Sequence, residues 1–187
     1  MADLPTLSFG TGDPGLFTYP QIVHLLTVEF ARARRYGYPL SCILFRIDRL
    51  ASIGDVQGWV ARDFVRERVV AAIRRESRAC DFVGRFPDDR FLVVLPHTDE
   101  VGARTLADRV ARSVSSLDFT VGERVLRATV SAGASCYRDR NTLFYDAVVY
   151  AAEQALLEAE RSGGARVLVR DPKPRGFEPP AETEETF

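Results

Sequence analysis

The amino-acid sequence predicts an α/β protein, specifically a ferredoxin-like α+β sandwich in which helices flank a central, mostly antiparallel sheet. The chain has 187 residues, of which 46% are hydrophobic and 27% charged, so a single domain can bury a core of its own. Helix and strand patterns follow one another in the order α, β, α, β-β, α, β-β, α, β. Two β-α-β-like units around a central hairpin are typical of such sandwiches.

The first half of the body carries a clear local signal for each element. Thr18 is a candidate N-cap for a first amphipathic helix, which Gly37 would end. An apolar run rich in strand formers follows, then a second helical stripe. Pro87-Asp88-Asp89 predicts a type I turn between two further strands, because proline presets φ at the first corner. The helices are predicted at 18–37 and 59–77, and the strands at 40–47, 80–86 and 90–95.

The second half continues the alternation. A third helix is followed by a pair of strands around Gly122-Glu123, and a fourth helix closed by Gly163-Gly164 leads to a last strand. The two chain ends are expected to be a flexible arm and a disordered, acidic, proline-rich tail, since neither has enough apolar surface to order itself. The helices are predicted at 98–115 and 142–161, the strands within 119–137 and at 166–169, and the arm, body and tail at 1–13, 14–170 and 171–187.

Composition also limits the partners and the compartment. The formal net charge of −1 provides no basic excess for a phosphate backbone, so we expect no nucleic-acid partner. No apolar run approaches the roughly 20 residues that cross a bilayer, so we expect no membrane contact. Cys42, Cys80 and Cys136 are odd in number and lie in apolar runs. We therefore expect buried thiols in a reducing compartment, hence a cytoplasmic protein.

Several short segments of the body together resemble one known family. Their order and spacing, with no insertion from Arg46 to Arg109, resemble the GGDEF domain, the fold of diguanylate cyclases. This resemblance implies a nucleotidyl-cyclase-like fold. For the family it also implies the condensation of two GTP molecules across a homodimer with two divalent metals. The segments are residues 31–40, Arg46-Ile47-Asp48, residues 82–96 around the signature hairpin, Val130-Ser-Ala-Gly-Ala134, and residues 152–156 with 161–164.

The metal positions implied by the resemblance are altered. Arg46 and Asp48 stand where the family has Asp-x-Asp, and Asp89 matches the metal-binding acid of the signature. Mg²⁺ requires oxygen ligands, whereas arginine has no acceptor atom and a permanent positive charge. A positive charge in place of a negative one reverses the electrostatics of a metal site. We expect a salt bridge between Arg46 and Asp89, and neither a metal nor another cofactor.

The signature turn and the nucleotide contacts implied by the resemblance are also changed. Both signature glycines, the acid that follows the metal ligand and a phosphate-binding lysine are replaced, and only the aspartate of the guanine-reading pair remains. Replacing the first glycine by proline fixes φ and removes an N–H group where substrate approaches the backbone. We therefore expect a catalytically inactive domain. In this sequence these positions are Pro87, Asp88, Arg90, Glu160, Gly54 and Asp63.

One ligand-binding motif of the family is present. Many of these cyclases bind their product, cyclic di-GMP, at an inhibitory site marked Arg-x-x-Asp, and Arg78-Ala79-Cys80-Asp81 has the matching register. The family's secondary arginine aligns with Arg109, and Arg85 is a further candidate contact. Arginine can pair with O6 and N7 of guanine, and a carboxylate can accept from its N–H groups. Alternatively, Arg78 and Asp81 form an exposed ion pair of little energetic value.

Three functions remain open on this basis. The first is a cyclic di-GMP receptor in bacterial second-messenger signalling that uses Arg78, Asp81, Arg109 and Arg85. The second is a ligand-independent scaffold that binds a protein partner or forms a homodimer. The third, ranked below both, is a residual GTP-binding domain or an active diguanylate cyclase.

Overall fold

The computed structural model describes residues 15–121, 124–138, 142 and 144–172. The predicted arm at 1–13, the Gly122-Glu123 turn and residues 173–187 of the predicted tail lie outside these ranges. Among the described residues, no helix is both long and apolar enough to span a bilayer.

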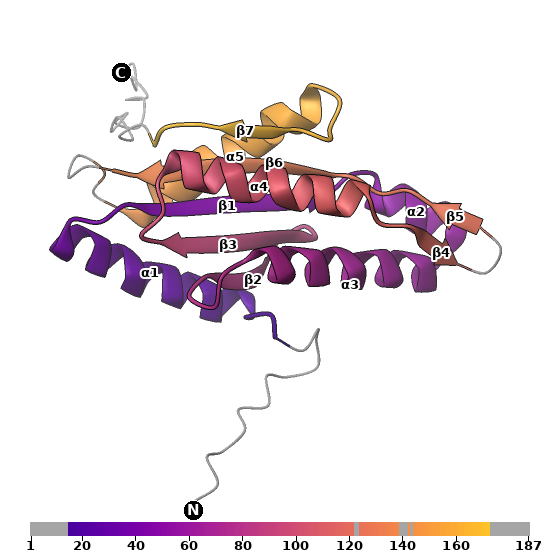
Figure 1. Cartoon of the computed structure of the whole chain (residues 1–187), viewed down its shortest axis with the longest axis horizontal. Coiled ribbons are helices and arrows are strands. Elements are labelled where there is room, and N and C mark those ends of the chain that lie inside the picture. Colours follow the sequence, from indigo (N-terminus) through magenta and orange to yellow (C-terminus); the bar gives the residue numbers. More distant parts are fainter. Residues whose placement is uncertain (1–14, 122–123, 139–141, 143, 173–187) are drawn as a thin grey trace, which may run out of the picture.

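A five-stranded sheet forms the centre of the domain (Figure 1), in the order β2-β3-β1-β6-β7. Its first four strands pair antiparallel, and only β7 runs parallel to its neighbour β6. The predicted mixed α/β fold with a mostly antiparallel sheet is therefore confirmed. The strands are β1 (Leu40–Ile47), β2 (Phe82–Phe86), β3 (Arg90–Pro96), β6 (Val130–Tyr137) and β7 (Val167–Val169), and a separate two-stranded sheet joins β4 (Phe119–Val121) to β5 (Arg124–Leu126).

Helices cover both faces of this sheet. Alternate residues of β1 enter two different cores: Ile43 and Phe45 face one, and Cys42 and Leu44 face the other. This is the expected behaviour of a strand buried on both faces. The first core is completed by α3 (Trp59–Glu76) and α4 (Glu100–Ser115), and the second by α1 (Tyr19–Tyr36) and α5 (Tyr145–Arg161).

Three details of the fold differ from the predictions. A short helix, α2 (Leu50–Gln57), follows β1 and had no clear signal, because it has only eight residues and contains Gly54. The region after α4 holds three strands (β4, β5 and β6) instead of two. Cys80 is exposed, because β2 begins only at Phe82 and the thiol lies in the preceding turn; Cys42 and Cys136 are buried as expected.

The β2–β3 turn also departs from type I geometry. Asp88 and Asp89 both have positive φ, at 61° and 55°, whereas a type I turn keeps φ negative at both central positions. Aspartate is among the side chains that tolerate this region best. The turn lies at the same end of the sheet as the carboxyl end of β1, because Arg46 pairs in register with Arg90.

Candidate functional site

A polar hollow of about 400 Å³ lies where β1 ends, beside the β2–β3 turn and the carboxyl end of α5. We call it the end hollow. It contains the altered metal positions, and an adjoining hollow of similar volume shares Asp48, Arg49 and Gly163 with it. The end hollow is lined by Arg46, Ile47, Asp48, Arg49, Leu50, Ala51, Asp89, Glu160, Gly163 and Gly164.

Arg46 forms an ion pair across the end hollow with Glu160 of α5, at 3.1 Å between Nη1 and Oε1. The predicted Arg46–Asp89 salt bridge is therefore wrong. Both partners of the observed pair differ in sign from the residues that the family resemblance implies, aspartate at position 46 and lysine at 160. Because both charges are reversed, the attraction between the positions is retained.

Asp89, which the family resemblance aligns with a metal-binding acid, is bound by Arg62 of α3. The Arg62 guanidinium also lies over the Trp59 ring, 4.9 Å from its centroid. A Cβ added at Gly54 would lie 3.2 Å from Cδ of Arg62, so the arginine stem occupies space beside Gly54. Sequence reasoning missed Arg62, because no local pattern links it to a turn so far along the chain.

Other charged residues at positions singled out by the family resemblance also form ion pairs within the protein. Arg90 pairs with Glu153 of α5 and, at 3.3 Å, with Asp88, and it lies over the Phe86 ring. Asp63, which the family resemblance aligns with a guanine-reading aspartate, is exposed and lies 3.5 Å from Arg66 on the same helix. The structure therefore does not bring Asp63 into the end hollow.

Asp48 acts as a structural acceptor at the floor of the end hollow. Its carboxylate accepts hydrogen bonds from the hydroxyls of Thr129 and Ser131, both at 2.6 Å, and from the backbone N–H of Ala165 at 3.0 Å. These bonds tie β1 to β6 and to the loop before β7. A carboxylate held by three donors stabilises the fold without a cation.

The Arg-x-x-Asp motif, residues 78–81, lies in the turn that leads from α3 into β2. Asp81 accepts from the backbone N–H of Arg78 at 2.7 Å, and its own N–H donates to the Arg78 carbonyl at 3.1 Å. Asp81 therefore closes the turn through the backbone, while the Arg78 side chain is exposed. This differs from a simple side-chain ion pair.

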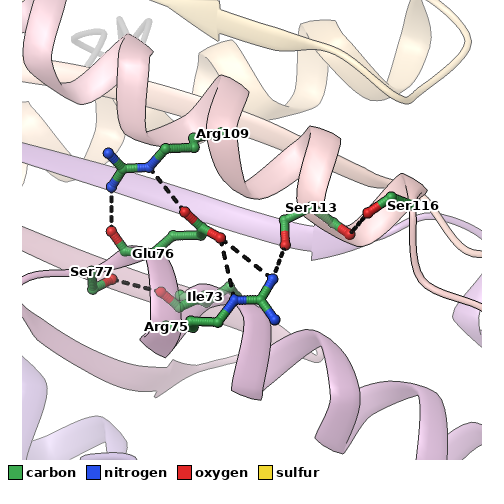
Figure 2. A network of polar contacts seen from close by, with 7 residues as sticks. All are labelled: Ile73, Arg75, Glu76, Ser77, Arg109, Ser113 and Ser116. Carbon is green, nitrogen blue, oxygen red and sulfur yellow. Dashed lines mark hydrogen bonds and ion pairs between the residues drawn. The ribbon is translucent and has the colours of Figure 1, made fainter.

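Arg109 reaches the same turn from α4 (Figure 2). Its Nε lies 3.0 Å from the Glu76 carboxylate, and its Nη2 donates to the Glu76 carbonyl, at the last residue of α3. The structure thus ties Arg109 to Glu76, the last residue of α3, which precedes the turn that contains Arg78 and Asp81. Arg85 lies on the following strand, where its backbone N–H donates to the Phe17 carbonyl at 2.8 Å. Glu76 was not predicted as part of this cluster.

Comparison with known proteins agrees with the fold. Residues 20–166 match the family model described as "Diguanylate cyclase, GGDEF domain". Diguanylate cyclase DgcP of Pseudomonas aeruginosa is 32% identical over 144 residues, which cover 77% of this chain and 21% of that protein. Diguanylate cyclase A of Treponema denticola is 29% identical over 147 residues, covering 78% and 38%. The chain thus spans well under half the length of these relatives.

Solved structures of diguanylate cyclases and GGDEF domains have a similar fold. Diguanylate cyclase SiaD of Pseudomonas aeruginosa, in complex with its activator SiaC, superposes with a TM-score of 0.80 at 29% identity, covering 87% of this chain and 62% of that one. The GGDEF domain of DgcB from Caulobacter crescentus, in complex with c-di-GMP, has a TM-score of 0.80 at 22% identity, covering 85% and 94%. The second likeness concerns the fold alone.

Proposed function

This chain belongs to the diguanylate cyclase GGDEF family, and we propose that it is a catalytically inactive member that serves as a cyclic di-GMP receptor. The proposed ligand contacts are Arg78, Asp81 and Arg109, with Arg85 as a further contact. The observation that carries the proposal is the bond from Arg109 to the Glu76 carbonyl, because it fixes an arginine of α4 at the end of α3, just before the turn that contains Arg78 and Asp81.

The chemistry of this cluster suits a cyclic dinucleotide. A guanidinium can donate two parallel hydrogen bonds to a phosphate or to O6 and N7 of guanine. One edge of the Asp81 carboxylate holds the Arg78 N–H group, and a carboxylate has enough lone pairs to accept from a guanine edge as well. A ligand with two phosphates and two guanines would therefore meet complementary groups.

The ion pairs of the end hollow support the loss of catalysis. A divalent cation at the position that the resemblance implies would have to displace Arg62 from Asp89 and lie near Arg46. A doubly charged ion about 4 Å from a guanidinium is repelled by about 2 kcal/mol even at the dielectric constant of water. We expect no dinucleotide product from GTP with Mg²⁺ or Mn²⁺. Turnover that Asp89→Ala abolishes would contradict this expectation.

Isothermal titration with cyclic di-GMP tests the receptor function directly. The wild-type protein should bind with a Kd in the low micromolar range or below, about −8 kcal/mol, and Arg78→Ala should abolish this binding. Arg104→Ala is the matched control, since Arg104 is also exposed and pairs only loosely with Asp108, at 3.8 Å. Absence of binding by the wild type would refute the proposal, and equal losses in both variants would indicate nonspecific electrostatics.

A ligand-independent interaction module is the second candidate. It is favoured by three apolar side chains at the junction of α2 and α3: Val56, Trp59 and Val60 are 71%, 72% and 80% exposed. Such exposed apolar groups commonly mark protein contacts. Light scattering would then show an oligomer without cyclic di-GMP that Val60→Asp converts to a monomer.

A further inference from the structure

Glu76 lies at the centre of a polar network that includes Arg109, one of the proposed ligand contacts (Figure 2). It is the last residue of α3, and its side chain is only 19% exposed. Its carboxylate lies between two arginines, 3.0 Å from Nε of Arg109 and 3.4 Å from Nε of Arg75. One carboxylate therefore forms ion pairs with two arginines.

The contacts of Arg109 with Glu76 occupy one of the two edges of the guanidinium that can donate a pair of parallel hydrogen bonds. Its Nε and Nη2 atoms form one edge of the planar group, and both are directed at Glu76, one at the carboxylate and the other at the carbonyl oxygen. Bidentate recognition of phosphate or guanine needs two such parallel donors. A ligand that takes this edge must therefore displace Glu76.

Arg75 offers the displaced Glu76 carboxylate a second ion-pair partner. Arg75 binds the same Glu76 carboxylate and also donates to the Ser113 hydroxyl on α4. If Arg109 turns to a ligand, Glu76 retains an ion pair with Arg75. After this exchange the partly buried Glu76 carboxylate still has a partner. Leaving it unpaired would be energetically costly.

We propose that Glu76 is a built-in competitor for Arg109 and sets the affinity of this site for cyclic di-GMP. The inference rests on the proposed receptor function. In the free protein Glu76 holds Arg109, and in the complex a phosphate or guanine of the ligand replaces the carboxylate. Glu76 thereby acts as a positioning residue for Arg109. It lowers the affinity of the site for its ligand and favours anionic ligands, which can compete with the Glu76 carboxylate for Arg109.

Titration of the full chain with cyclic di-GMP tests this role. Glu76→Gln should bind about two- to fivefold more tightly than wild type, the gain expected from removing one partly exposed ion pair. Glu67→Gln removes the same charge from an exposed position on the same helix and should leave affinity unchanged. In an Arg109→Ala background, the gain from Glu76→Gln should disappear, which a merely structural role of Glu76 would not explain.

Arg75→Ala provides a second test in the opposite direction. Without Arg75, the displaced carboxylate loses its other partner, so ligand binding should weaken although Arg75 itself need not touch the ligand. Wild-type binding combined with unchanged or weaker binding by Glu76→Gln would overturn the inference and leave the receptor intact. Absence of binding by both proteins would overturn the receptor and the inference together. Binding by Glu76→Gln alone would refute the receptor function of the wild-type protein, although it would show that Glu76 blocks the site completely.

Discussion

The Arg46–Glu160 ion pair makes a measurable prediction about the end hollow. At the observed separation of 3.1 Å, Coulomb's law gives about 5 kcal/mol at an effective dielectric constant of about 20, and about 1 kcal/mol in bulk water. The two side chains are 44% and 25% exposed, so solvent screens much of this attraction. Double-mutant cycles on exposed pairs give roughly 0.2–1 kcal/mol, and we expect a coupling energy of about 0.5–1 kcal/mol.

A double-mutant cycle with Arg46→Gln, Glu160→Gln and the combined variant measures this coupling. Urea unfolding followed by far-ultraviolet circular dichroism would give the free energy of unfolding of each protein. The coupling should shrink strongly at 1 M NaCl, where the Debye length is about 3 Å. The charge exchange Arg46→Glu with Glu160→Arg should recover most of the stability lost by Arg46→Glu alone, because that single change gathers carboxylates in the hollow. A coupling energy of zero at low salt would refute the pairing.

Two further predictions concern packing and reactivity. Gly133→Ala should lower the free energy of unfolding by about 3 kcal/mol in urea titrations, because an added Cβ would overlap the Ala152 carbonyl oxygen of α5; a loss below 1 kcal/mol would mean that α5 shifts easily. In thiol titrations of the folded protein, one cysteine, Cys80, should react quickly, while burial raises the pKa of Cys136, and that of Cys42 to about 12, so both react only after unfolding. Fast reaction of all three thiols would contradict the two buried cores.

Much of the fold was predictable because its signals are local. The predicted strand at residues 40–47 matches β1, because an apolar run of eight residues has the usual length of a buried strand and is short for a helix. Both α1 and α3 begin within two residues of their predicted starts. The helix α2 was missed because a short segment with an internal glycine has weak helical propensity, and packing of Leu50 in the core stabilises it.

The partners in the candidate site were less predictable than its positions. The resemblance located Arg46, Asp89 and Arg109, but which residue each one contacts depends on tertiary distances. One signal was available: positions 46 and 160 both differ in sign from the family, and two reversed charges attract one another just as the original pair does. By contrast, no pattern in the sequence singles out Arg62 from the other arginines of α3.

The two ends of the domain now differ in electrostatic character, and this difference favours the α3 end as the place for an anionic ligand. At the end hollow, two of the lining carboxylates are already paired: Glu160 with Arg46, and Asp89 with Arg62 of α3. At the end of α3, Arg75 and Arg109 share the Glu76 carboxylate, and the Asp81 carboxylate bonds to the backbone N–H of Arg78. Two guanidinium groups that share one carboxylate retain positive charge that attracts phosphates, and Glu76 can leave Arg109 while it keeps its ion pair with Arg75. A cyclic dinucleotide should therefore compete successfully at the α3 end, whereas a metal-bound triphosphate in the end hollow would have to break two existing ion pairs.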